Sequence, residues 1–397
     1  MKKWDVVVVG AGMIGLAAAY ELVKKGAKTA LLDAGGLGSG ASAANMGLVI
    51  STDAEPGLIS KLTSKSLELL ERLSLELEYD LNYREKSFID ILYSKEDLLR
   101  GEKMAAGLKA KGFECRLLTP RELQGMEPGT TFPDALGGLY TKQGSIDPFS
   151  LLYGYYQAAR KKDLDWFPYT KVIGFETSGA KVTGVCTRQM SFHADTVVLA
   201  AGAWTRELAA LLGYDLPQYY IHGECMVTEV MPPILNSCVG LPVNRVEFED
   251  SVSCLAAKNG WENLGLMDEC DLVVVQVHNG NLIIGQKTYV HPEFKGDTTY
   301  TGMAEMAKKA VRVLPDLSYV SVIRSWVSPV PFTPDHQPFL GPLGRYENLI
   351  VSSGYKSTII LTPLAGKLVS RMALGESLDY ALEEFYPGRF TEKELEA

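Results

Sequence analysis

Three glycines near the N-terminus have the spacing of a dinucleotide-binding turn. Gly10, Gly12 and Gly15 form the pattern Gly-x-Gly-x-x-Gly, and Asp33 follows further along the chain. In this pattern the first glycine allows a tight turn, the second lets the backbone approach a pyrophosphate, and the third allows a helix to pack closely on a strand. An acid at the position of Asp33 accepts hydrogen bonds from ribose hydroxyls and disfavours a 2′-phosphate, so the pattern indicates NAD or FAD and not NADP.

The residues around these glycines predict the strand, helix and strand that the pattern requires. Residues 5–9 are a continuous apolar run rich in valine, typical of a parallel strand buried on both faces. Residues 13–25 have helical spacing that Gly26 ends, and residues 28–32 form a second apolar strand that stops at Asp33. The helix N-terminus therefore faces the phosphates of the nucleotide.

Beyond residue 48 the pattern predicts more elements of the same nucleotide-binding domain and a second region rich in strands. Residues 35–48 are rich in Gly, Ala and Ser and form no packed element on their own. Thr119 opens a capping box, and Asn279-Gly280 is a hairpin signal between strands of residues 217–290. The other predicted helices cover residues 56–77, 147–161, 300–314 and 357–372, and the other predicted strands lie within 166–199 and at 348–352.

Length, charge and cysteine content limit the classes of protein that fit. A chain of 397 residues favours two domains, and a net charge of −9 without a basic face argues against nucleic acid as a partner. No apolar window is long enough for a transmembrane helix, so we expect a cytoplasmic protein. No metal site is expected, because neither the histidines nor the cysteines show ligand spacing; the residues are His193, His222, His278, His291, His336, Cys115, Cys186, Cys225, Cys238, Cys254 and Cys270.

Four further segments carry a resemblance to a known family. They are the small-residue loop 40–47, the strand end and glycine turn at 194–204, the segment 324–338 with its Arg-x-Trp…Thr-Pro-Asp-x-x-Pro pattern, and the C-terminal loop and helix start at 353–366. With the N-terminal glycines, these segments resemble the FAD-dependent family that contains D-amino-acid oxidase, glycine oxidase, sarcosine oxidase and the β-subunits of heteromeric amino-acid dehydrogenases. The resemblance covers essentially the whole chain.

The resemblance implies FAD as the cofactor and a fold to hold it. The implied fold class is α/β for the cofactor domain and α+β for the chain overall. A Rossmann-like FAD-binding domain comprises residues 1–48, 141–215 and 331–397. It is interrupted by a mainly antiparallel β substrate domain with a few helices, which comprises residues 49–140 and 216–330. Most of the expected cofactor contacts lie on the motifs just described. The expected cofactor-binding residues are Gly10, Gly12, Met13, Ile14, Gly15, Asp33, Ala34, Ser42, Ala43, Asn45, Met46, Gly47, Val172, Ala200, Ala201, Gly202, Trp204, Pro331, Gly354, Tyr355, Lys356, Ser357 and Thr358.

The sequence departs from the family pattern at the place where relatives bind the substrate carboxylate. Val330 occupies the position of the arginine that D-amino-acid and glycine oxidases use, so a simple D-amino acid is not assumed as substrate. Lys356 replaces a residue of the usual Ser-Gly-His-Gly run and either supplies positive charge or lies at the flavin edge. The candidates for lining the active site are Lys356, Tyr355, His222 and Glu224.

The activity implied is FAD-dependent oxidation of a carbon–nitrogen bond in an amino acid or a secondary or N-substituted amine. Hydride passes to flavin N5, and water hydrolyses the imine. Two alternatives stay open: an FAD-dependent 2-hydroxy-acid dehydrogenase, and a β-subunit that acts mainly in assembly and electron transfer. The expected partners are a small amine or amino-acid substrate and either other dehydrogenase subunits or further copies of this chain. An NAD-dependent dehydrogenase is disfavoured by the segments around residues 40–47 and 333–335.

Overall fold

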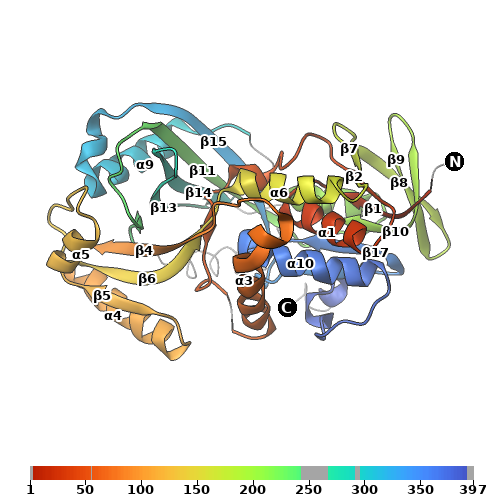
Figure 1. Cartoon of the computed structure of the whole chain (residues 1–397), viewed down its shortest axis with the longest axis horizontal. Coiled ribbons are helices and arrows are strands. Elements are labelled where there is room, and N and C mark those ends of the chain that lie inside the picture. Colours follow the sequence, from red (N-terminus) through yellow and green to blue (C-terminus); the bar gives the residue numbers. More distant parts are fainter. Residues whose placement is uncertain (1–2, 55, 243–266, 291–295, 391–397) are drawn as a thin grey trace.

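The chain folds around two β-sheets that lie side by side along its longest axis (Figure 1). The structure is a computed structural model that describes residues 3–54, 56–242, 267–290 and 296–390. Within these residues, sheet A has eight strands in the order β16-β17-β10-β1-β2-β7, with β8 and β9 attached to β10. Their bounds are β1 (Lys3–Val9), β2 (Thr29–Leu32), β7 (Asp165–Phe167), β8 (Val172–Ser178), β9 (Lys181–Thr187), β10 (Ser191–Leu199), β16 (Phe339–Leu343) and β17 (Tyr346–Ser353).

Sheet A is parallel at its centre and buried on both faces. Strand β1 pairs in parallel with β10 on one side and β2 on the other. Val6 and Val8 face one layer of apolar side chains, and Val7 and Val9 face another, because successive residues of a strand point to opposite sides. One face is covered by four helices: α1 (Met13–Lys24), α3 (Leu58–Leu77), α6 (Pro148–Arg160) and α10 (Thr358–Ala373).

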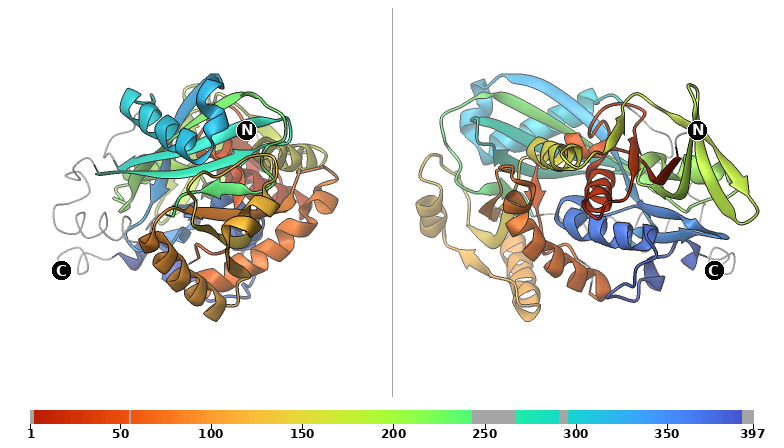
Figure 2. Two further views of the ribbon diagram at one scale, coloured as in Figure 1. Left: turned by 90° about the vertical axis from the view of Figure 1, so that its left-hand side faces the viewer. Right: turned by 45° about the vertical axis from the view of Figure 1, so that its right-hand side comes forward.

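Sheet B is mainly antiparallel and has nine strands in the described chain. Its order is β15-β11-β14-β13-β12-β4-β6-β3, with β5 beside β6. The bounds are β3 (Leu48–Val49), β4 (Arg84–Leu92), β5 (Cys115–Leu118), β6 (Gly137–Ser145), β11 (Tyr219–Val230), β12 (Cys238–Gly240), β13 (Met267–Gln276), β14 (Asn281–Val290) and β15 (Val322–Phe332). Helix α9 (Tyr300–Val313) packs on one face, and α4 (Lys95–Ala110) and α5 (Pro120–Met126) lie at the outer end of the sheet (Figure 2).

The fold class predicted from the sequence is confirmed, as are most of the expected elements. The predicted helices appear as α1, α3, α6, α9 and α10, with small differences at their ends, and Thr119 forms the expected capping box of α5. The strands of residues 217–290 are longer than predicted. Strands β4 and β6 and helix α4 were not predicted. Helix α4 buries only Gly101 and Ala105, an apolar face too narrow for periodicity to reveal.

The domain boundaries remain a proposal. Strand β6 runs across the expected boundary at residue 141 yet lies wholly in sheet B. Among the described residues, no helix is long and apolar enough to span a membrane.

Candidate functional site

The glycine turn between β1 and α1 is packed so closely that side chains are excluded. Gly10 has φ 106°, and a Cβ there would lie 2.3 Å from the carbonyl oxygen of Ala200 at the end of β10. A Cβ on Gly15 would lie 1.9 Å from the carbonyl oxygen of Gly10. Both glycines are therefore required by the close approach of β1, α1 and the chain after β10.

The N-terminus of α1 is open towards the loop that follows residue 39. Gly12 is the N-cap residue and supplies no side-chain cap, and the backbone N–H of Met13 donates to Oγ of Ser42 at 3.0 Å. A Cβ on Gly12 would lie 2.9 Å from the same Ser42 oxygen. The turn, the positive end of the helix dipole and a hydroxyl thus meet at one point, which suits a pyrophosphate.

Asp33 ties the glycine turn to the chain that follows β2. One carboxylate oxygen accepts a hydrogen bond from the backbone N–H of Ala11 at 2.7 Å. The other accepts from the backbone N–H of Gly35 at 2.7 Å and from Oγ of Ser39 at 3.0 Å. A carboxylate has about four lone-pair sites, so these three bonds leave acceptor capacity for a ribose hydroxyl.

The loop at residues 40–47 is held in place by sheet B. Nε1 of Trp326 on β15 donates to the carbonyl oxygen of Ala44 at 2.7 Å. Inside the loop, Nδ2 of Asn45 donates to the carbonyl oxygen of Ser42 at 2.6 Å, and its Oδ1 accepts from the backbone N–H of Gly47 at 2.8 Å. The loop contains a four-residue helix, α2 (Ala41–Ala44), that buries none of its residues.

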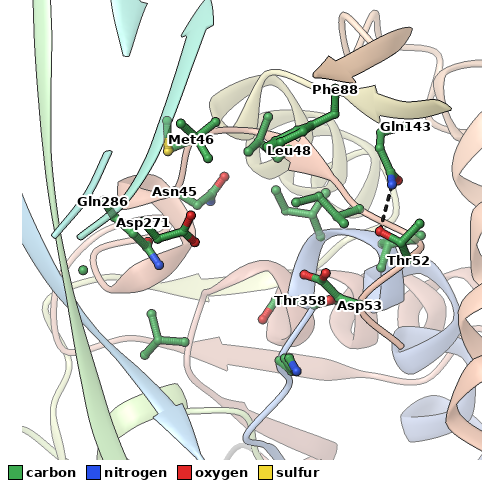
Figure 3. A pocket seen from close by; sticks show the side chains of 18 of the residues that line it. Asn45, Met46, Leu48, Thr52, Asp53, Phe88, Gln143, Asp271, Gln286 and Thr358 are labelled. Carbon is green, nitrogen blue, oxygen red and sulfur yellow. Dashed lines mark hydrogen bonds between the residues drawn. The ribbon is translucent and has the colours of Figure 1, made fainter. Parts of the chain in front are cut away.

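A cavity of about 580 Å³ opens between this loop, the start of α10 and one face of sheet B (Figure 3). Several residues expected from the sequence to contact the cofactor line it: Met13, Ser42, Asn45, Met46, Lys356, Ser357 and Thr358. Across the cavity, Ser328, Val330 and Phe332 of β15 and Ile221, Gly223 and Cys225 of β11 face inward. The cavity therefore lies between the expected nucleotide site and sheet B.

His222 and Glu224 do not line this cavity, which corrects their expected placement. Alternate residues of β11 point to opposite faces, and the inward set is that of Gly223. Glu224 is instead fully buried at the start of α9, where the backbone N–H of Thr299 donates to its carboxylate at 2.8 Å and burial raises its pKa. His222 stacks on Tyr289, with ring centroids 5.0 Å apart.

Three other expected residues also have side chains directed away from the cavity. The ring of Tyr355 is packed in the helix-covered core of sheet A, where burial raises the pKa of its hydroxyl and Oγ of Ser352 lies 2.8 Å away. Pro331 points opposite to the inward residues of β15, and Val172 is buried in the other core of sheet A. Contacts of these three with a cofactor would have to come from the backbone.

The turn after β10 lies where the sequence placed it, next to the glycine turn. The backbone N–H of Ala200 donates to the carbonyl oxygen of Val9 at 2.8 Å. Oγ of Ser353 donates to the carbonyl oxygen of Gly202 at 2.9 Å, and Trp204 lies against the position of Gly40. The ends of β1, β10 and β17 therefore come together at one edge of sheet A.

Sequence reasoning missed the polar residues that sheet B and its loops contribute to the cavity. Strand alternation could have grouped some of them on one face, but no motif marks them. They are Thr52, Asp53, Asp90, Thr141, Gln143, Glu269, Asp271, Gln286, Thr288 and Ser328.

Within the described residues no group of three His, Cys, Asp or Glu side chains could hold a metal. Cys115, Cys186, Cys225, Cys238 and Cys270 are free thiols. Cys254 and His291 lie outside the described part of the chain.

The glycine cradle, the helix N-terminus and Asp33 fit a dinucleotide, and with the adjoining cavity they define the class of protein: a dinucleotide-dependent enzyme whose cavity lies between the nucleotide site and sheet B. Comparison with known families gives the same class a name. The family described as FAD dependent oxidoreductase matches residues 5–372, and the chain belongs to it. The enzyme is thus an FAD-dependent oxidoreductase, and the cofactor expected from the sequence is confirmed.

Relatives match the chain over nearly its full length. Hydrogen cyanide synthase subunit HcnC of Pseudomonas protegens is 28% identical, with 98% of this chain and 97% of the relative covered. Glycine oxidase of Geobacillus kaustophilus is also 28% identical, with 96% of each chain covered. The crystal structure of that glycine oxidase has a TM-score of 0.84 and covers 98% of this chain and 100% of its own. Sarcosine oxidase subunit beta of an Arthrobacter species is 26% identical, covering 89% of this chain and 82% of the relative.

Proposed function

We propose that the chain oxidises a carbon–nitrogen bond in an amino acid or an N-substituted amine. The observation that carries the proposal is the cavity, because the loop at 41–46, the segment 356–360 and sheet B line it together. The similarity to glycine oxidase and to sarcosine oxidase subunit beta supports an amine as the substrate. FAD, when bound, accepts a hydride from the carbon next to the nitrogen, and water then hydrolyses the imine.

The protein's own part in this reaction is to hold the cofactor and orient the substrate. The N–H groups at the start of α1 and the hydroxyl of Ser42 would hold the pyrophosphate, and Asp33 would hold the ribose. The N-terminus of α10 begins with Thr358 on the cavity wall, and its dipole would stabilise negative charge that develops beside it. Sheet B forms the opposite wall of the cavity, where a substrate would be oriented.

Val330 and Lys356 shape the expected substrate range. Val330 faces the cavity and cannot bind a carboxylate, whereas Lys356 lines the opposite wall and carries a positive charge. We infer that Lys356 is the carboxylate contact of this enzyme. Because one ammonium replaces a bidentate guanidinium, glycine and D-alanine should be poor substrates compared with larger or N-substituted amino acids.

A second candidate role is that of a subunit in a heteromeric dehydrogenase. Two relatives are named as subunits, hydrogen cyanide synthase subunit HcnC and sarcosine oxidase subunit beta. In that role the chain would oxidise the amine and pass the electrons to a partner protein.

The test is anaerobic titration of the purified, FAD-loaded chain with a panel of amines, amino acids and 2-hydroxy acids. We expect the long-wavelength flavin absorption to bleach with at least one amine and with no 2-hydroxy acid. Bleaching by a 2-hydroxy acid alone would replace the proposal with alcohol oxidation. A preparation that neither contains nor takes up FAD would contradict the assignment of the nucleotide site.

A further inference from the structure

One row of residues crosses four strands of sheet B on the face that lines the cavity. Glu269 on β13 is the register partner of Thr288 on β14, and Thr288 is the partner of Gly223 on β11. Gly223 is in turn the partner of Ser328 on β15. All four line the cavity. The row therefore runs carboxylate, hydroxyl, glycine, hydroxyl along the cavity wall.

The two hydroxyl-bearing residues of this row are largely buried. Thr288 is 5% exposed and Ser328 is 7% exposed. In the part of the chain that the structure describes, neither side chain makes a hydrogen bond within the protein. Because both residues line the cavity, their hydroxyls can bond polar groups of a ligand there.

Gly223 leaves room for the amide of Gln286. A Cβ at this position would lie 2.9 Å from Oε1 of Gln286, which also faces the cavity. The amide oxygen therefore lies beside the row, between the strands that carry Thr288 and Ser328. This part of the wall carries an amide oxygen, two hydroxyls and a carboxylate.

The net negative charge of the cavity lining favours a cationic ligand group. Four carboxylates line it, Asp53, Asp90, Glu269 and Asp271, against two lysines, Lys111 and Lys356, so the described lining has a formal charge of −2. Asp271 lies next to the row, in the β13–β14 bulge opposite Gln286, and projects into the cavity (Figure 3). Glu269 and Asp271 already interact with other parts of the protein, but each carboxylate can accept several hydrogen bonds.

We propose that the substrate carries a second cationic group, apart from the nitrogen whose bond is oxidised, and that Glu269 and Thr288, which are partners on adjacent strands, bind it. The substrate class is then a diamine or a diamino acid. A carboxylate and hydroxyl oxygens accept the N–H donors of an ammonium, and the negative lining keeps that group charged. Val330 is consistent with this proposal, because an arginine at that position would repel the cationic group of the substrate. This inference rests on the proposed amine oxidation and adds its substrate class.

The test compares substrates that differ only in the second charge. Lysine is paired with norleucine, and 1,4-diaminobutane with butylamine, both enantiomers being used for the amino acids. Stopped-flow reduction of the FAD-loaded chain without oxygen gives an apparent Kd and a limiting rate for each. We expect the charged member of each pair to bind more tightly, by roughly tenfold or more, as for hydrogen bonds to charged groups.

Variants then test whether the tighter binding of the charged substrates depends on this row of residues in sheet B. Glu269→Gln should raise the apparent Kd of lysine and diaminobutane by roughly tenfold or more and should change the apparent Kd of norleucine and butylamine much less. Asp268→Asn is the matched control: it removes the same charge from the neighbouring residue of β13, which pairs with Lys287 on the other face. Thr288→Val removes only a hydroxyl and should weaken the binding of the same two substrates to a smaller degree.

Two results would overturn the inference: equal binding of lysine and norleucine, or an equal loss of affinity in the Glu269 and Asp268 variants. If no amine of either series reduces the flavin but a 2-hydroxy acid does, the proposed function itself is wrong. If amines react without regard to the second charge, only the substrate class is wrong.

Discussion

At the scale of single residues, the nucleotide site is governed by backbone contacts that leave no space for a side chain. Gly10 and Gly15 are fixed by the packing of β1, α1 and the chain after β10, and Gly12 by Ser42 above the helix N-terminus. These requirements are local. The glycine spacing therefore predicts them without knowledge of the rest of the fold.

Gly12→Val should abolish FAD binding. The Cβ alone would lie 2.9 Å from Oγ of Ser42, and the branched side chain would occupy the space in front of the helix N-terminus. The measurement is the flavin-to-protein ratio after reconstitution with excess FAD. Gly107→Val is the control, because a Cβ on that exposed glycine of α4 meets nothing within 4 Å; full flavin content in both variants would show that the turn does not hold the cofactor.

Glu224→Gln should leave the rate of flavin reduction unchanged, because Glu224 faces α9 and not the cavity. Its pH dependence should differ from that of the parent chain. Burial raises the pKa of Glu224 above 4.5, so the folded state binds this proton more tightly than the unfolded state does. The contribution of Glu224 to the free energy of unfolding therefore falls as pH rises from below 4.5 through the raised pKa. The Glu224→Gln variant lacks this loss, so its free energy of unfolding relative to that of the parent should be higher at neutral pH than near pH 4.

Urea unfolding at several pH values measures this difference. A constant offset between the two proteins would show that Glu224 does not titrate in this window. A large fall in the rate of flavin reduction would show instead that Glu224 acts in the active site.

At the scale of elements, the sequence predicted those whose pattern is local and missed those whose role depends on register. The strand, helix and strand around Gly10 carry continuous apolar runs and a glycine stop, so they can be recognised alone. The inward face of β11 cannot, because shifting a strand by one residue exchanges its two faces. This is why Glu224 was expected in the cavity, and why Thr288 and Ser328 were not.

Trp326→Phe should weaken FAD binding without disrupting either sheet. The change removes the hydrogen bond by which β15 holds the carbonyl oxygen of Ala44, and thereby loosens the loop over the start of α1. A lost hydrogen bond of about 0.5–1.5 kcal/mol corresponds to a rise in Kd of roughly twofold to tenfold.

Fluorescence titration of the apoprotein with FAD measures that change. Trp166→Phe, on β7, is the matched control and should keep the parent affinity, because its indole packs against Tyr156 and the helix-covered core of sheet A and makes no hydrogen bond among the described residues. An unchanged Kd for the Trp326 variant would mean that the loop is held by other contacts.

At the scale of the whole molecule, the proposed role beside partner subunits makes a kinetic prediction. In that role the electrons taken from the amine would pass to a partner protein and not to oxygen. The isolated chain, once reduced by its substrate, should therefore react slowly with oxygen and quickly with a dye acceptor. Peroxide formation at a rate equal to dye reduction would show instead a self-sufficient oxidase.

The strand order of sheet A also has a consequence for how the protein is made. Strand β1 lies between β10 and β2, β10 pairs with β17, and α1 packs against α10, so the nucleotide edge needs segments from both ends of the chain. During synthesis the N-terminal segments emerge first, but β17 and α10 emerge after residue 345. The glycine turn can therefore reach its final packing only after β17 and α10 have been synthesised. We expect FAD to bind at that late stage and not to a shorter nascent chain.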